Sequence, residues 1–174
     1  MRARTAAQGG RGAEREGTLS RAARCYEGPF GPIDIALGEK LRVTRLSGPS
    51  IPTITLPWGP ASTEDGPTAK AALRAGLRCR VGAEEWVFCQ PSFGIPRSRR
   101  ALHVSAPDRR WIARVRSLAT LSVEHEDTGS WVARLGFSRW GELAPSFDRD
   151  DVLVTVLLFG SSLIAETELG YAPF

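Results

Sequence analysis

Seven arginines gather in the middle of the chain, and their type and spacing suit the binding of an anion. Only one acid, Asp108, lies among them. A guanidinium group can hold a phosphate or carboxylate through two parallel hydrogen bonds. The cluster could equally be the solvated face of a hairpin in an arginine-rich protein. The candidate ligand-binding residues are Arg97, Arg99, Arg100, Arg109, Arg110, Arg114 and Arg116. The stretch 91–100, rich in proline and arginine, is the best candidate for a ligand-binding loop.

Three aspartates could bind a divalent cation through their carboxylates. Asp148, Asp150 and Asp151 stand directly before a long apolar run, however. Acids in the first turn of a helix complement its dipole, and this role is far commoner than metal binding. We therefore interpret the three aspartates as the start of a helix and predict no metal site.

Histidines and cysteines could form a base and a nucleophile. The candidates are His103 and His125 with Cys79 or Cys89, but no third group that would orient the histidine is evident. Buried cysteines on strands are usually unreactive. The sequence also lacks a phosphate-binding glycine loop, a zinc-protease helix motif and a serine-nucleophile motif. We predict no enzymatic activity and no cofactor.

The basic character of the chain lies in its first residues. Residues 1–24 hold six arginines and two glutamates, which equals the net charge of +4 of all 174 residues. The segment has almost no large apolar side chains, so we predict a disordered basic tail, or a translation start further downstream. Acids interrupt the tail and aromatics are absent from it, so nucleic acid is not a predicted partner. We expect residues 25–174 to form a single domain.

Cysteine usage bears on the compartment. The three cysteines are Cys25, Cys79 and Cys89, an odd number without a CxxC pair. This disfavours a disulfide framework and favours a reducing compartment. The N-terminus lacks the apolar core of a secretion signal, so we expect a cytoplasmic protein.

Alternating apolar and polar residues predict strands along most of the chain from Cys25 onward. Two segments, Trp111–Arg114 (WIAR) and Trp131–Arg134 (WVAR), share one pattern. On a strand, the tryptophan and alanine of each segment would share one face. We expect most of the tryptophans to lie in a core rather than to stack on bases. The tryptophans are Trp58, Trp86, Trp111, Trp131 and Trp140.

The C-terminal run predicts a helix over residues 148–169. Its segment Val152–Ala165 has no polar side, so it must be a membrane span or a buried axis. The run is shorter than the roughly 20 apolar residues of a span. We predict no transmembrane span and a buried axis in which Phe159 contacts the strands of Trp111 and Trp131.

Many strands followed by one apolar helix resemble the tubby-C-like superfamily, which includes the LURP-one-related proteins and the phospholipid scramblases. The resemblance rests on the WIAR and WVAR strands, the segment Phe147–Asp151 and the helix Val152–Ala165, and it covers roughly residues 77–170. It implies a β-barrel around a central hydrophobic helix, of a kind seen in small bacterial proteins. Members bind phosphoinositides, act at membranes or have no known activity, and only the fold is carried over.

The expected fold is therefore mainly β with one C-terminal helix, an antiparallel meander or barrel wrapped around a hydrophobic core helix. The expected function is that of a small non-enzymatic domain that binds anionic lipid headgroups or a protein partner. The alternative is an accessory or immunity-type protein that acts by occluding a partner's surface.

Overall fold

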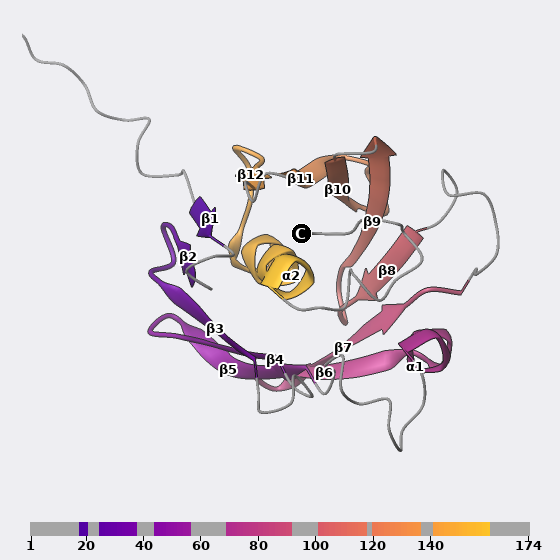
Figure 1. Cartoon of the computed structure of the whole chain (residues 1–174), viewed down its shortest axis with the longest axis horizontal. Helices are drawn as coiled ribbons and strands as arrows, with labels where there is room; N and C mark the ends of the chain where they lie inside the picture. Colours follow the sequence, from indigo (N-terminus) through magenta and orange to yellow (C-terminus); the bar gives the residue numbers. More distant parts are fainter. Residues whose placement is uncertain are drawn as a thin grey trace, which may run out of the picture.

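The computed structural model describes residues 18–20, 25–37, 44–56, 69–91, 101–117, 120–136 and 141–160 (Figure 1). This part of the chain forms twelve strands and two helices. In chain order they are β1 (Thr18–Ser20), β2 (Cys25–Glu27), β3 (Ile33–Leu37), β4 (Thr44–Gly48), β5 (Ile51–Leu56), α1 (Ala69–Ala75), β6 (Leu77–Val81), β7 (Glu84–Cys89), β8 (Ala101–Ser105), β9 (Arg110–Ser117), β10 (Thr120–His125), β11 (Trp131–Gly136), β12 (Gly141–Leu143) and α2 (Arg149–Gly160).

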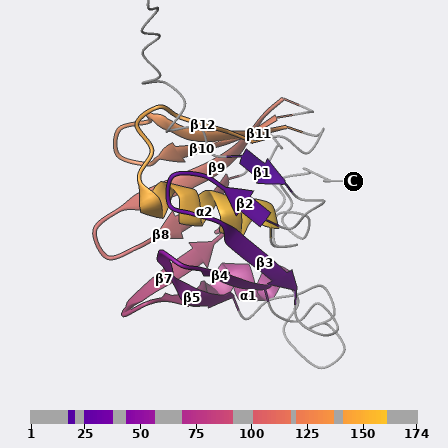
Figure 2. The same cartoon turned by 90° about the vertical axis from the view of Figure 1, so that its left-hand side faces the viewer.

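One antiparallel sheet contains all twelve strands, and each strand pairs with the next along the chain. This confirms the predicted fold class, a mainly β meander with a helix near the C-terminus. The sheet curls around α2, and its outermost strands, β1 and β12, come into contact (Figures 1 and 2). In the described residues no ladder joins β1 to β12, so the curled sheet is not a closed barrel there.

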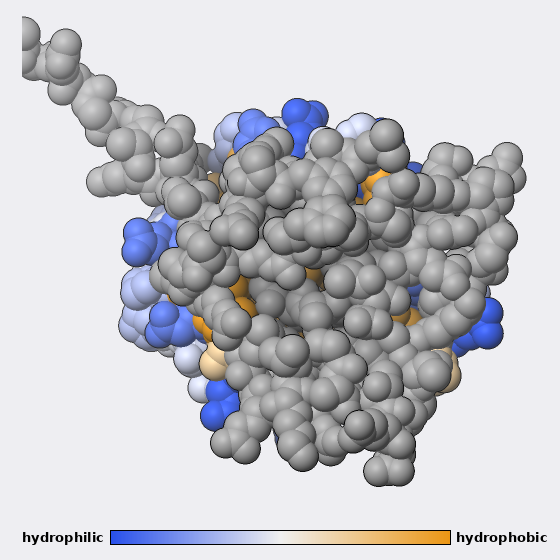
Figure 3. Space-filling view, viewed as in Figure 1, coloured by the Kyte–Doolittle hydropathy of each residue, from blue (hydrophilic) through white to orange (hydrophobic). Residues whose placement is uncertain are grey.

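Helix α2 fills the concave side of the sheet, where it contacts β4 and β11 (Figure 1). Every side chain from Asp151 to Leu158 is buried. Where described residues are visible in Figure 3, hydrophilic ones stand at the periphery and apolar ones nearer the middle. The predicted core helix is confirmed as far as Gly160, while residues 161–169 and the side chain of Phe159 lie outside the described part. No helix of the described residues is long and apolar enough to cross a membrane.

The aspartates before α2 cap the helix, as the sequence indicates. Asp148 Oδ1 accepts hydrogen bonds from the backbone N–H groups of Asp150 (2.9 Å) and Asp151 (3.0 Å). In return, Asp151 Oδ2 accepts one from the backbone N–H of Asp148 at 3.2 Å. The other oxygen of Asp151 accepts the indole N–H of Trp111 at 2.8 Å and lies 3.4 Å from Nε2 of His125. This reciprocal cap therefore also fixes the start of α2 to β9 and β10.

A β-bulge in β11 reverses the orientation of one tryptophan. Val123 of β10 pairs with Ala133, but the next residue, Glu124, pairs with Trp131, so Val132 is an extra residue in the ladder. A bulge of this kind shifts the alternation of side chains by one position. Val132 and Ala133 are both buried, while Trp131 is half-exposed and shares the outer face with Glu124.

The two segments with the shared tryptophan pattern therefore differ in orientation. Trp111 and Ala113 are fully buried on the inner face of the sheet, as predicted. The prediction that Trp131 faces the core in the same way is wrong, because the bulge lies between Trp131 and Ala133.

Strand β1 lies inside the segment predicted as a disordered tail. Thr18, Leu19 and Ser20 pair with Glu27, Tyr26 and Cys25 of β2. The sheet therefore begins before residue 25. The remainder of residues 1–24 lies outside the described part.

Helix α1 was not predicted, since its first residues belong to a stretch rich in turn formers. Leu73 is fully buried, and its carbonyl accepts the backbone N–H of Gln90 at the end of β7. Gly76 follows with a φ of 86°, the left-handed conformation that favours glycine after a helix. One buried leucine thus attaches this short helix to the sheet.

We expect Asp151→Ala to lower the free energy of unfolding by about 1–3 kcal/mol, because the buried Trp111 N–H would lose its acceptor. Denaturant melts of the full chain measure the change. Asp150→Ala is the control, since Asp150 only pairs with the exposed Arg149, and it should cost no more than about 1 kcal/mol. Equal losses in the two variants would contradict the role given to Asp151.

We expect Leu153→Ala and Leu158→Ala each to cost about 2–5 kcal/mol. The two side chains project about 140° apart around the helix, and both are fully buried. A helix with one solvent-facing side would lose stability in only one of the variants. A near-neutral result for either would therefore show that α2 is not covered all round.

Candidate functional site

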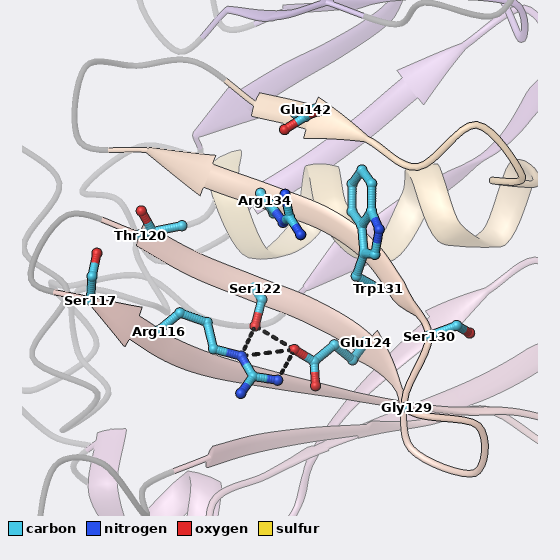
Figure 4. Close-up of a pocket in the computed structure, with 10 residues that line it drawn as sticks. All are labelled: Arg116, Ser117, Thr120, Ser122, Glu124, Gly129, Ser130, Trp131, Arg134 and Glu142. Atoms are coloured by element: carbon cyan, nitrogen blue, oxygen red, sulfur yellow. Dashed lines mark hydrogen bonds and ion pairs between the residues drawn. The ribbon is translucent and has the colours of Figure 1, made fainter.

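A hollow of about 680 Å³ lies on the outer face of β9–β12 (Figure 4). Its strand residues alternate with the inward-facing Leu121, Val123 and Ala133, which places them on the side of the sheet away from α2. We call this surface the outer hollow. It is lined by Arg116, Ser117, Thr120, Ser122, Glu124, Gly129, Ser130, Trp131, Arg134 and Glu142.

Two β-bulges shape the outer hollow. One is the bulge at Val132 that turns Trp131 outward. The other lies in β9, where Ser117 pairs with Thr120 and Val115 with Leu121, so Arg116 is the extra residue. Bulges often redirect side chains beside functional sites, and here one of them adjoins a tryptophan and the other holds an arginine.

Arg116, Glu124 and Ser122 form the polar floor of the outer hollow (Figure 4). Arg116 Nε donates to Ser122 Oγ and to Glu124 Oε1, both at 3.0 Å, and the Ser122 hydroxyl donates to Glu124 Oε1 at 2.7 Å. Burial acts to raise the pKa of the Glu124 carboxyl, but hydrogen bonds from Arg116 and Ser122 outweigh it and the pKa is lowered. Glu124 therefore stays ionised and holds Arg116 in place.

Two further arginines flank this floor. Arg114 of β9 and Arg134 of β11 are the two register partners of Ser122 on β10. The Arg134 guanidinium lies 4.5 Å from the ring centroid of Trp131, a cation–π contact. Arg134 also pairs in register with Glu142 of β12. Within the described part, neither Arg114 nor Arg134 has an ion pair with an acid.

The predicted arginine cluster is divided among several places. Arg114 and Arg116 lie at the outer hollow, and Arg110 is exposed on the same strand. Arg109 instead forms an ion pair with Asp148 at the start of α2, which raises the pKa of Arg109. The other three members, with loop residues 92–100, lie outside the described residues: Arg97, Arg99 and Arg100.

A smaller hollow of about 460 Å³ adjoins Arg109 and Arg110. Glu126 and Asp127, with Asp108, also line it. These acids balance the two arginines, so this hollow is a weaker candidate for an anion than the outer hollow.

The cysteines and histidines do not form a nucleophile–base pair in the described residues. Cys79 is buried and donates to the carbonyl of Thr55, and burial raises the pKa of its thiol to about 12. Cys89 faces His103 across β7 and β8, and His103 Nδ1 lies 3.0 Å from Glu126 Oε1. Glu126 is thus the third group that the sequence did not reveal, yet no hydrogen bond joins the Cys89 thiol to His103.

Metal binding finds no support in the part of the chain that the structure describes. No group of three His, Cys, Asp or Glu side chains there could hold a metal ion. Asp148 and Asp151 instead cap α2, while Asp148 pairs with Arg109 and Asp150 with Arg149.

Sequence analysis did not identify Ser122, Glu124, Trp131, Arg134 or Glu142 as site residues. Glu124 carried one signal, a carboxylate in a strand with an otherwise apolar and hydroxyl pattern, which predicts a buried partner of opposite charge. The outward position of Trp131 depends on a bulge, and a bulge is set by pairing with a neighbouring strand.

We expect Glu124→Gln to lower the free energy of unfolding by about 1–2 kcal/mol at pH 7, through loss of the charged hydrogen bonds to half-exposed Arg116. Because the folded state lowers the pKa of Glu124, its contribution is present above the usual glutamate range and is lost as the pH falls through the lowered value. The difference from wild type should therefore close below about pH 4. Denaturant melts from pH 3 to 7 test this. The exposed Glu142→Gln is the control, and a pH-independent difference for Glu124→Gln would contradict the prediction.

Compared with known proteins, the chain matches no family model, no curated protein and no solved structure.

Proposed function

We propose that the protein is a non-enzymatic binding domain that recognises an anionic group of its ligand in the outer hollow. One observation carries the proposal. A bulge turns Trp131 out of the core into a hollow that Arg116 and Arg134 line and that Arg114 adjoins as the register partner of Ser122.

In the part of the chain that the structure describes, the concave side of the sheet, where many barrels bind ligands, holds α2, whose side chains from Asp151 to Leu158 are buried. Among the described residues, the outer face of the sheet is therefore the better place for a ligand.

Charge at the outer hollow favours an anion. Glu124 neutralises Arg116, which leaves Arg114 and Arg134 on either side of the Ser122 hydroxyl. Two guanidinium groups at such positions can close on one phosphate or carboxylate. Among the described residues, two carboxylates, Glu124 and Glu142, face three arginines at the hollow, so the local balance is positive.

The anionic group could belong to a lipid headgroup or to an acidic side chain of a protein. The arginines at the outer hollow lie on two strands that flank β10, a compact arrangement that suits a single group better than a broad membrane surface. The alternative function, occlusion of a partner's surface, is supported by Trp131 and Arg134, because tryptophan and arginine are common at the centres of protein interfaces. We further propose a reducing, cytoplasmic setting, which the free thiols of Cys79 and Cys89 support. The resemblance to the tubby-C-like superfamily stays a prediction.

Titration calorimetry of the full chain with pyrophosphate tests the proposal. We expect Arg114→Gln and Arg134→Gln each to weaken binding about tenfold, since a charged hydrogen bond contributes roughly 1.5–3 kcal/mol. Arg45→Gln, an exposed arginine on β4, is the control and should bind as wild type does. Because residues 1–24 carry the net charge, only this comparison of variants isolates the outer hollow.

Vesicle sedimentation separates the two sources of the anion. Binding to phosphatidylserine vesicles that is lost in Arg134→Gln favours a lipid headgroup, and pyrophosphate binding without vesicle binding favours a soluble or protein-borne anion. Absence of anion binding, or an equal loss in Arg45→Gln, would overturn the proposal.

A further inference from the structure

We infer that the ligand carries a flat ring beside its anionic group, as a nucleoside monophosphate does, and that the ring stacks on Trp131. This inference rests on the proposed function and narrows the class of ligand. It depends on the outward position of Trp131, on the hollow that its side chain lines, and on the arginines Arg114 and Arg134 beside that hollow.

Trp131 gives up part of the apolar burial of its indole, which is unfavourable unless a ligand covers the ring. Trp111, in the same sequence pattern, is fully buried and gains the large apolar burial of an indole. The extra residue Val132 prevents Trp131 from doing the same. The indole is left half-exposed in a hollow, where a ligand can recover the burial that the core does not supply.

The two sides of the Trp131 ring differ. Arg134 covers one face, with its guanidinium 4.5 Å from the ring centroid. In the view of Figure 4, Gly129 and Ser130 lie below the Trp131 ring, at the turn that leads into its strand. Both are small, and a Cβ built on Gly129 would meet no atom within 4 Å. The hollow of about 680 Å³ that Trp131 lines has room for a flat ring, which would complete a layer of guanidinium, indole and ligand ring.

The anion site adjoins this stacking position. Trp131 pairs with Glu124, whereas Arg114 and Arg134 pair with Ser122, two residues earlier on β10. Two residues of a strand span about 7 Å. The ring and the anionic group of one small ligand can thus be bound together in the same hollow.

A sugar phosphate fits these groups less well. Carboxylates are common acceptors for carbohydrate hydroxyls, but of the two that line the hollow Glu124 is already engaged by Arg116 and Ser122 and is 6% exposed, which leaves Glu142. A ring that is recognised mainly by its face needs no such acceptors, and stacking on an aromatic side chain tolerates different ring identities.

Binding of four probes to the full chain tests the inference: AMP, ribose 5-phosphate, inorganic phosphate and adenosine. We expect AMP to bind about tenfold more tightly than ribose 5-phosphate, the size of effect that one stacked base gives. Trp131→Leu should abolish this advantage, so that AMP and ribose 5-phosphate bind that variant equally, whereas Arg45→Gln, away from the hollow, should keep the wild-type difference between the two. Trp131→Phe should retain part of the advantage, because its ring can still stack.

Ser130→Leu provides a second route if Trp131→Leu does not fold. A leucine there would narrow the hollow next to Trp131 and should weaken AMP more than inorganic phosphate. Equal affinities for AMP and ribose 5-phosphate, or an AMP advantage that survives both substitutions, would overturn the ring inference and leave the proposed anion site intact. If neither AMP nor inorganic phosphate binds, the proposed function fails as well.

Discussion

Helix α2 has no polar side, and the rest of the structure follows from the need to cover it. A helix whose side chains are buried in every direction cannot lie on a flat sheet, which would cover only one of its faces. The twelve strands therefore curl until β1 and β12 meet. Covering the helix also limits where polar side chains can form a binding site. Once α2 occupies the concave side of the sheet, polar chemistry is left to the convex face and to the loops.

The buried Asp151 carboxylate joins the helix to the same strands that carry the outer hollow. It caps α2 and accepts the Trp111 N–H on the inner face of β9. Arg114 and Arg116 project from the outer face of that strand, and Ser122 from the outer face of β10. Through backbone pairing, an interaction that anchors the core also fixes the positions of the site residues. The hollow is therefore built on strands that are attached to the start of α2, as a preorganised site requires.

Features that depend on local pattern could be predicted from the sequence. Alternation gave the strands, the apolar run gave the core helix, and the three aspartates gave its start, because each signal is contained within a few neighbouring residues. The outer hollow could not be predicted in this way. Arg116 and Val132 become extra residues only when β9 and β11 pair with β10. Charge alone was misleading, since Arg109 adjoins Arg110 in sequence but pairs with Asp148 of the helix cap.

The two tryptophan segments show how little sequence separates a core position from a surface one. WIAR and WVAR differ in a single apolar residue, and a pattern of alternation treats them alike. In β9 the ladder is regular around Trp111, so the indole packs inward against Trp86, with ring centroids 5.1 Å apart. In β11 one extra residue turns the same side chain outward beside Arg134. An extra residue leaves one position of the ladder unpaired, and the buried Val132 offsets part of that cost by adding an apolar side chain to the core. The bulge therefore keeps the core filled while it places an aromatic ring on the outer face of the sheet, beside Arg134.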